Sequence, residues 1–224
     1  QRARWPSLAD YWPHAREAFG SAPAARTADA SGVGFETDPR LELASVLLRL
    51  AGALGSDDGA NVLGREAAEK FSVFSGHPAV ARVAALARRG GARLPLRLAL
   101  ALGAPPELSD AQAPSAEWLA VAGGTGAWKS FAADARAFAL EAHVWPFYDA
   151  SRSRYAEMIA RARAEARYGS PPKAAQDYLG MALPRRARFV LAPLLPPALG
   201  FDYSESDASG AVRVFVRPAA AGAG

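Results

Sequence analysis

The segment from Asp38 to Gly52 constrains the fold more than any other part of this chain, because it carries the marks of a buried helix. Asp38 can accept a hydrogen bond from the open amides of a first helical turn. Pro39 suits the first helical position because it has no amide to leave unbonded. The leucines that follow recur three and four residues apart and share one helical face: Leu43, Leu47, Leu50 and Leu54. The sequence therefore predicts a helix from Pro39 to about Leu54 that is buried over most of its surface.

One polar stripe interrupts this apolar helix. Glu42, Ser45 and Arg49 recur at intervals of three and four residues. One interpretation is a polar wall that faces a cleft or another subdomain. The other is that the helix shows a narrow face to water, or that Glu42 and Arg49 are neutralised by partners elsewhere in the fold. The second interpretation is favoured because buried charges are usually paired.

Helical patterns continue along most of the chain. The sequence predicts further helices over residues 60–74, from Pro78 to Gly90, over 94–102, around Trp118 and after Ser170. The strongest periodicity is one stripe of apolar side chains spaced alternately by three and four residues: Trp128, Phe131, Ala135, Phe138, Ala142 and Trp145. This spacing predicts a helix packed on the core, and Pro146 is expected to bend or restart it.

Strand character is found only near the end of the chain. Residues 187–191 and 211–216 are short β-prone runs, and the acidic segment between Asp202 and Asp207 is interpreted as a solvated hairpin loop. We therefore expect an α+β fold that is mainly α, with a multi-helix domain followed by a small C-terminal β element. The expected organisation is an N-terminal arm over residues 1–36, a helical domain over 37–183, a β-rich element over 184–218 and a disordered tail over 219–224.

Composition excludes several classes of protein. With 224 residues, 50% of them hydrophobic, the chain can bury a substantial core. No stretch approaches the roughly 18 consecutive apolar residues of a membrane span. The lack of cysteine in the sequence rules out disulfides and thiolate chemistry. The net charge is +4, but basic side chains alternate with acidic ones, so the gathered positive face of a nucleic-acid-binding protein is not expected.

A glycine-rich segment at residues 123–130 comes close to a phosphate-binding loop. It reads Gly-Gly-Thr-Gly-Ala-Trp-Lys-Ser. A phosphate-binding loop needs glycine immediately before its Lys-Ser so that backbone amides can wrap the phosphates, and Trp128 occupies that place. We therefore interpret the segment as the entry to a helix, with Thr125 as its cap.

No catalytic or metal-ligand constellation stands out in the sequence. Zinc enzymes of the His-Glu-x-x-His type need two imidazoles one helical turn apart, whereas His14, His77 and His143 are distant from one another. His77 is more simply the residue that precedes Pro78 at a helix start. No Gly-x-Ser-x-Gly elbow occurs, and the acidic segment near the C-terminus lacks the glycine of a calcium loop. A catalytic Ser/His/Asp triad assembled from residues that are distant in the sequence remains an open alternative.

Three segments together resemble an uncharacterised bacterial domain family described as gluzincin-like zinc metallopeptidases. They are residues 38–52, which begin Asp-Pro-Arg-Leu-Glu-Leu, residues 71–80, which read Phe-Ser-Val-Phe-Ser-Gly-His-Pro-Ala-Val, and the aromatic helix through Phe147, Tyr148 and Tyr155. The resemblance spans most of residues 35–216. It implies that two late strands lead into a helix bearing His-Glu-x-x-His, where the histidines would hold zinc and the glutamate would activate water.

The resemblance assigns no catalytic residue to this chain. Residues 212–216 would be the strand before the zinc helix, and the 224 residues contain no such motif. We therefore expect no metal ligand and no cofactor here, although zinc serves the family that the chain resembles. The expected function is that of the non-catalytic helical portion of a zinc metallopeptidase, inactive by itself. The resemblance also implies a bacterial protein that is secreted or in the cell envelope, with a cytoplasmic location as the alternative.

Two other functions compete with this interpretation. One is a helical module without enzymatic activity, which binds an unknown peptide or protein in a groove between the Pro39 helix and the Trp128 helix. The other is an enzyme with a dispersed site, which assigns binding roles to Glu42, Arg49 and His77 and predicts a concave pocket joining these side chains. Neither nucleic acid nor a membrane span enters any of the three.

Overall fold

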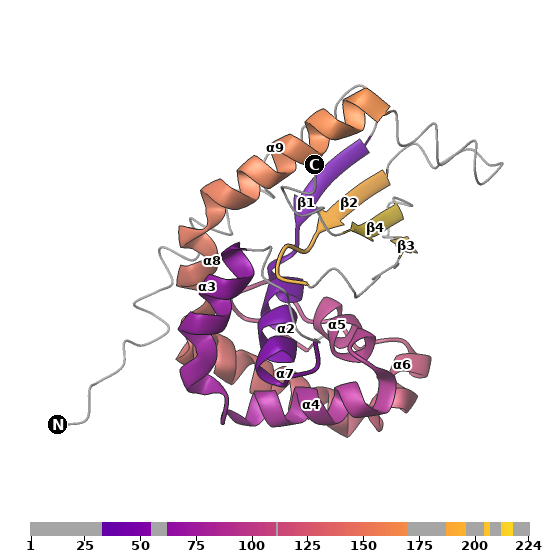
Figure 1. The fold of residues 1–224 in the computed structure, drawn as a ribbon. Helices are drawn as coiled ribbons and strands as arrows, with labels where there is room; N and C mark the ends of the chain where they lie inside the picture. The colour runs from indigo at the N-terminus through magenta and orange to yellow at the C-terminus, as the bar shows by residue number, and fades with distance from the viewer. Residues whose placement is uncertain are drawn as a thin grey trace.

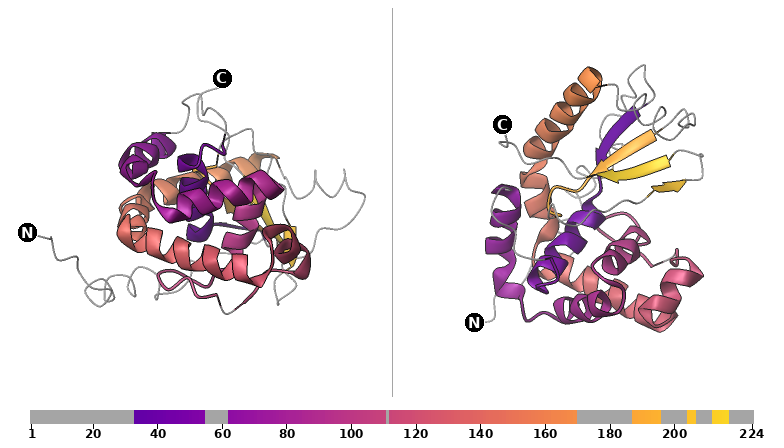
Figure 2. Two further views of the ribbon diagram at one scale, coloured as in Figure 1. Left: turned by 90° about the horizontal axis from the view of Figure 1, so that it is seen from below. Right: turned by 45° about the vertical axis from the view of Figure 1, so that its right-hand side comes forward.

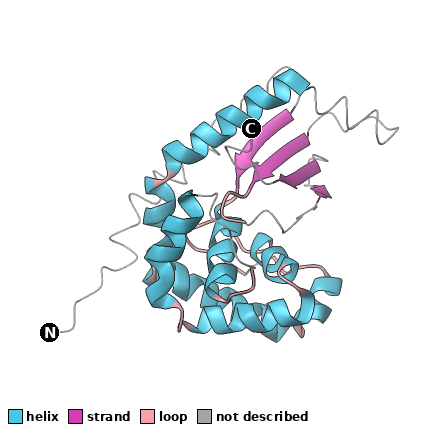
Figure 3. Cartoon of the chain, viewed as in Figure 1, coloured by secondary structure: helices cyan, strands magenta, loops and turns pink. Residues whose placement is uncertain are grey.

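The computed structural model describes residues 33–54, 62–110, 112–169, 187–195, 204–206 and 212–216, and this part of the chain has the predicted mainly helical α+β fold (Figure 1). Its elements in chain order are β1 (Val33–Thr37), α2 (Pro39–Leu50), α3 (Val62–Phe71), a 3-10 turn (Ser72–Phe74), α4 (Pro78–Gly90), α5 (Arg93–Leu100), α6 (Ala116–Ala122), α7 (Thr125–Glu141), α8 (Val144–Ala150), α9 (Arg152–Gly169), β2 (Ala187–Leu191), β3 (Ser204–Ser206) and β4 (Val212–Val216). Most helices gather at one end of the molecule and the strands at the other (Figure 3).

Helix α2 begins where the sequence predicts. Asp38 is its N-cap and accepts a 2.9 Å hydrogen bond from the Arg40 backbone N–H, and Pro39 opens the first turn. The helix ends at Leu50 rather than at the expected Leu54, because Gly52 takes a left-handed conformation with φ of 64° that reverses the chain. Leu54 nevertheless lies in the core.

The core is built from the apolar faces of the central helices. Helix α2 packs against α3, α4 and α5, and α4 packs in turn against α7. The largest fully buried side chains come from these helices and from α5 and its C-terminal end: Leu41, Leu43, Leu47, Leu48, Phe71, Leu94, Leu96, Leu98, Leu102, Trp128, Phe131 and Phe138. The burial of most of α2, and of the Trp128 stripe as far as Ala142, confirms these two periodicities of the sequence.

The Trp128 stripe is interrupted before its last member. Helix α7 ends at Glu141, and His143 takes a left-handed φ of 54° before α8 begins. Trp145 therefore lies on a different helix and is only half-buried. The break precedes Pro146, which lies inside the first turn of α8, so the predicted restart occurs but its cause is the turn at His143.

Two helix starts differ from expectation. The segment predicted as one helix over 60–74 is α3, from Val62 to Phe71, followed by the 3-10 turn. At the α6–α7 junction the N-cap is Gly124, and Thr125 is the first helical residue instead of the cap. The helix after Ser170 and the tail over 219–224 lie outside the described residues.

The strands form one mixed sheet in the order β1-β2-β4-β3. β1 runs parallel to β2, with Phe35 opposite Phe189, and β2 runs parallel to β4. β3 pairs antiparallel with β4 at the edge. The predicted strands at 187–191 and 211–216 are confirmed. The sequence predicts a solvated hairpin loop for the acidic segment. This prediction is wrong for Ser204–Ser206, which form a strand paired with β4.

Strand β1 corrects the expected N-terminal arm. Residues 33–36, assigned to that arm, belong to a strand whose partner lies far along the chain. The expected boundary at residue 36 therefore falls within β1, and the sheet contains segments from both sides of the helical domain. Turn and alternation patterns in a short stretch of sequence reveal local structure. The pairing of β1 with β2 joins residues about 150 positions apart, so no such stretch contains both partners.

Helix α9 extends from the helical domain along the sheet. Two further views show it beside β1, and it contacts that strand (Figure 2). It is the longest helix of the described residues, at 18 residues, and no helix there is both long enough and apolar enough to cross a bilayer. The helical domain and the sheet therefore meet along α9.

Candidate functional site

The polar stripe of α2 points into the protein rather than to water. Glu42 is 2% exposed, Ser45 is fully buried and Arg49 is half-buried. The Ser45 hydroxyl donates to the Leu41 carbonyl at 2.6 Å within the helix. Ser45 is thus satisfied locally, whereas the partners of Glu42 and Arg49 come from other elements.

Glu42 lies against α9 and the segment that follows β2. The Tyr155 hydroxyl donates to Glu42 Oε2 at 2.9 Å, and the Leu194 backbone N–H also donates to this carboxyl group. Within the described part of the chain, Glu42 Oε1 has no hydrogen-bond partner. Burial raises the pKa of Glu42 from 4.5 to about 8, outweighing these two donors, and the Asp38 charge adds to the increase. Burial therefore favours the neutral form of the Glu42 carboxyl group.

Arg49 contacts the same residue from two helical turns farther along α2. Its Nη2 donates to the Leu194 carbonyl oxygen at 3.3 Å. Glu42 and Arg49 therefore engage the N–H and the C=O of one peptide residue. Residues 192–195, which include Leu194, are buried against the helical core. Buried backbone groups outside a sheet need partners of this kind.

Two tyrosines extend the cluster toward the sheet. The Tyr148 and Tyr155 rings lie 4.7 Å apart between centroids, and the Tyr148 hydroxyl shares a 2.6 Å hydrogen bond with Thr37 Oγ1 at the end of β1. Burial raises the pKa of both phenols, and so both stay neutral. The sequence showed Tyr155 only as a residue lining a helix. Nothing in its local pattern indicates the bond to Glu42, because the two residues meet only in the folded chain.

His77 lies elsewhere. Its Nδ1 accepts the Ala79 backbone N–H at 3.1 Å as the N-cap of α4, and Nε2 lies 3.4 Å from Glu141 Oε2. Its ring packs edge-on to Phe138 at 5.3 Å. These contacts are with α4 and α7, and none of them is shared with the contacts described for Glu42 and Arg49. The helix-start role of His77 is thus observed directly.

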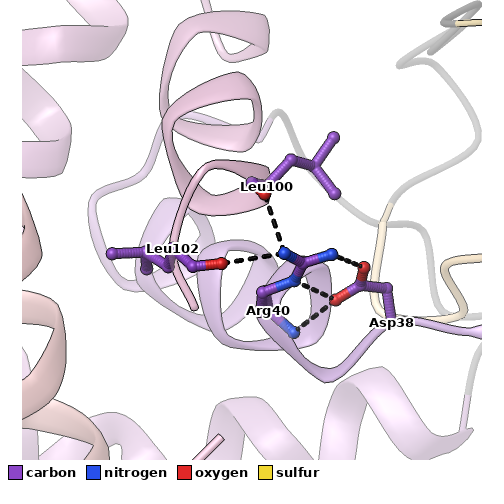
Figure 4. Close-up of polar contacts among 4 residues, drawn as sticks. All are labelled: Asp38, Arg40, Leu100 and Leu102. Atoms are coloured by element: carbon purple, nitrogen blue, oxygen red, sulfur yellow. Dashed lines mark hydrogen bonds and ion pairs between the residues drawn. The ribbon is translucent and has the colours of Figure 1, made fainter. Parts of the chain in front are cut away.

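A second polar cluster at the head of α2 was not singled out by the sequence. Arg40 Nε and Nη2 donate to Asp38 Oδ1 and Oδ2 at 2.9 and 2.5 Å (Figure 4). Arg40 Nη1 donates to the carbonyls of Leu100 and Leu102, both at 2.8 Å. Arg40 therefore binds the N-cap of its own helix and the open C-terminal carbonyls of α5, where a cation is also favoured by the helix dipole.

Metal and phosphate chemistry find no support in the described donors. No group of three or more His, Asp or Glu side chains in the described ranges is placed to hold a metal ion. Trp128, which stands where a phosphate-binding loop has glycine, is 1% exposed and belongs to the core. The sequence predicts a groove between the Pro39 and Trp128 helices, which are α2 and α7. In the structure, α4 packs against both of these helices.

Comparisons with models of known protein families, with curated proteins and with solved structures found no significant match to this chain.

Proposed function

We propose that this chain is the non-catalytic helical portion of a bacterial zinc metallopeptidase that is secreted or held in the cell envelope. The mixed sheet is the observation that carries the proposal. β2 and β4 run parallel at the end of a helical domain, at the positions where the resemblance expects the strands that lead toward a zinc helix. In this role the helices form a rigid support, and the sheet presents its strand ends to the catalytic part.

The chemistry of the described polar residues is consistent with a structural, non-catalytic role for this chain. Glu42 is a buried neutral acid whose carboxyl group is bound by Tyr155 and Leu194. The Nδ1 lone pair of His77 is occupied by the cap of α4. Glu42 is enclosed by the core and belongs to no group of three or more metal-ligating side chains, so we assign no zinc ligand in the described part of the chain. Their contacts hold elements together instead.

Metal analysis and a cleavage assay test the proposal on the purified 224-residue chain. After dialysis against equimolar zinc, we expect no stoichiometric zinc by mass spectrometry and no cleavage of a quenched-fluorescent peptide library. The Glu42→Gln variant should behave like the wild type in both assays. One tightly held zinc per chain, or cleavage that stops on addition of a chelator, would contradict the proposal.

The coding DNA beyond codon 224 provides a positive test. A continuation that encodes a His-Glu-x-x-His segment supports the peptidase assignment, and the longer chain should then bind one zinc. A stop codon directly after codon 224 overturns the assignment and favours the alternative, a helical module that binds a peptide or protein. The two outcomes need no assay of the shorter chain.

A further inference from the structure

We infer that α2 holds the segment after β2 by a clamp that loosens when Glu42 loses its proton. The clamp, here called the Leu194 clamp, consists of Glu42 at the Leu194 N–H and Arg49 at the Leu194 carbonyl. It ties residues 192–195, and through them β2, to the helical domain. The inference does not depend on the proposed function.

The clamped segment is apolar in its side chains. Residues 192–195 read Ala-Pro-Leu-Leu and carry no titratable side chain. Ala192, Leu194 and Leu195 are buried in the core, and the Leu195 N–H bonds back to the Ala192 carbonyl at 3.0 Å. The segment is thus packed in the apolar core, and Leu194 is tied to α2 at both its N–H and its carbonyl oxygen. Loss of the Glu42 tie therefore acts on this segment directly.

In the described part of the chain, a small set of groups faces Glu42. α9 contributes Tyr155, which bonds to it, and α8 contributes Tyr148, whose ring lies tilted against that of Tyr155. On α2 itself, Asp38 lies near enough to raise the pKa of Glu42, and Arg49 binds the far side of Leu194. From β1, Thr37 meets Tyr148, and the segment 192–195 brings only backbone. Both tyrosines stay neutral, so among these described groups Glu42 is the one whose charge changes as the pH rises toward 8.

Two donors are not enough for a buried carboxylate. An ionised carboxylate away from water is stable when several donors surround both oxygens, and here Oε1 has none among the described residues. The protonated form avoids this cost while Oε2 keeps its bond to Tyr155. Once residues 192–195 move away, water reaches the carboxyl group and restores an ordinary pKa. Ionisation therefore favours the open form.

The direction and range of the pH effect follow from the two pKa values. Below about pH 4.5 Glu42 is protonated in both forms, and above about pH 8 it is ionised in both. Between these values only the open form is ionised, so the opening equilibrium increases about tenfold per pH unit. The clamp is tightest in acid, loosens as the pH rises and reaches a constant level above about 8.

Amide hydrogen exchange on the full chain tests this inference. We expect the protection factor of the Leu194 amide, corrected for the intrinsic exchange rate, to fall about tenfold per pH unit between pH 5 and 8 and then to level off. At each pH it should lie below that of Val83 in α4, whose amide reports global unfolding. Glu42→Gln should remove the pH dependence at Leu194. Glu69→Gln, the same change at an exposed position of α3, should behave like the wild type.

Three results would overturn the inference. They are a Leu194 protection factor that does not change with pH, one equal to that of Val83 throughout, and an unchanged fall in Glu42→Gln. Should Glu42→Gln not fold, the wild type decides alone through the ¹³C shift of the Glu42 carboxyl carbon. Its titration midpoint should lie near 8, and a midpoint near 4.5 contradicts the clamp.

Discussion

The Glu42 carboxyl group on α2 accepts a hydrogen bond from the Tyr155 hydroxyl on α9, 113 residues later in the chain, at 2.9 Å and in full burial. This contact joins the first helix of the described chain to the last one. It sits in the same cluster as Leu194, so the helical domain, α9 and the sheet meet at one buried acid.

We predict that Glu42→Gln removes a pH dependence of global stability. Wild-type stability should fall as the pH rises from 5 to 8, because the folded state keeps a proton that the unfolded chain releases. One pKa unit corresponds to about 1.4 kcal/mol, so the fall should be about 3 kcal/mol. Urea unfolding at pH 5 and pH 8 measures it. The two curves should nearly coincide for Glu42→Gln, and Glu69→Gln should show the full wild-type shift.

Tyr155→Phe should destabilise the fold by about 1–3 kcal/mol, because it removes a donor from a buried acceptor. It should also move the pH transition of Glu42 upward, since the Tyr155 bond lowers the pKa of Glu42. Tyr148→Phe is the matched control. It removes the hydroxyl that meets Thr37 and leaves the Glu42 bond in place, so the transition should stay near pH 8. Urea unfolding across pH 5–10 separates the two variants, and equal transitions would contradict the assignment.

Arg40→Lys should cost about 1–3 kcal/mol of stability. A guanidinium reaches both Asp38 oxygens and the carbonyls of Leu100 and Leu102 at the end of α5 at once, and an ammonium has no such fork. Arg88→Lys, on the exposed side of α4, should change stability by no more than about 0.5 kcal/mol. Thermal unfolding at one pH compares them. Equal melting temperatures for the two variants would show that the Arg40 fork contributes nothing.

His77→Ala should be less stable than His77→Asn by about 1 kcal/mol, because asparagine can still accept the Ala79 N–H at the start of α4. Both variants lose the ring contact with Phe138, so their difference isolates the cap. Thermal unfolding of the pair measures it. Equal stability of the two variants would contradict the capping role of His77.

Local signals in the sequence were sufficient for several helices. The cap at Asp38 and the proline at Pro39 place the start of α2, and His77 and Pro78 do the same for α4. In each case the determining groups lie within a few residues of the helix end. The periodicity from Trp128 onward likewise depends only on which face of one helix is apolar.

Distant partners explain what the sequence could not supply. The polar stripe of α2 was recognised, and the favoured interpretation was that it faces water or that its charges are neutralised elsewhere in the fold. Tyr155 and Leu194 could not be named, because they approach Glu42 only after α9 and β2 are in place. The forked role of Arg40 depends in the same way on the end of α5, which lies 60 residues away. The function assigned from the resemblance stays a prediction.

The parallel pairing of Val33–Thr37 with Ala187–Leu191 has a consequence for biosynthesis. A ribosome delivers β1 early and its partner much later, whereas the contacts among α2, α4 and α5 lie within a short stretch of chain. The helical bundle can therefore fold during translation. The edge of β1 stays unpaired until the late strands have been synthesised. During that interval the nascent protein exposes a strand that another molecule could capture.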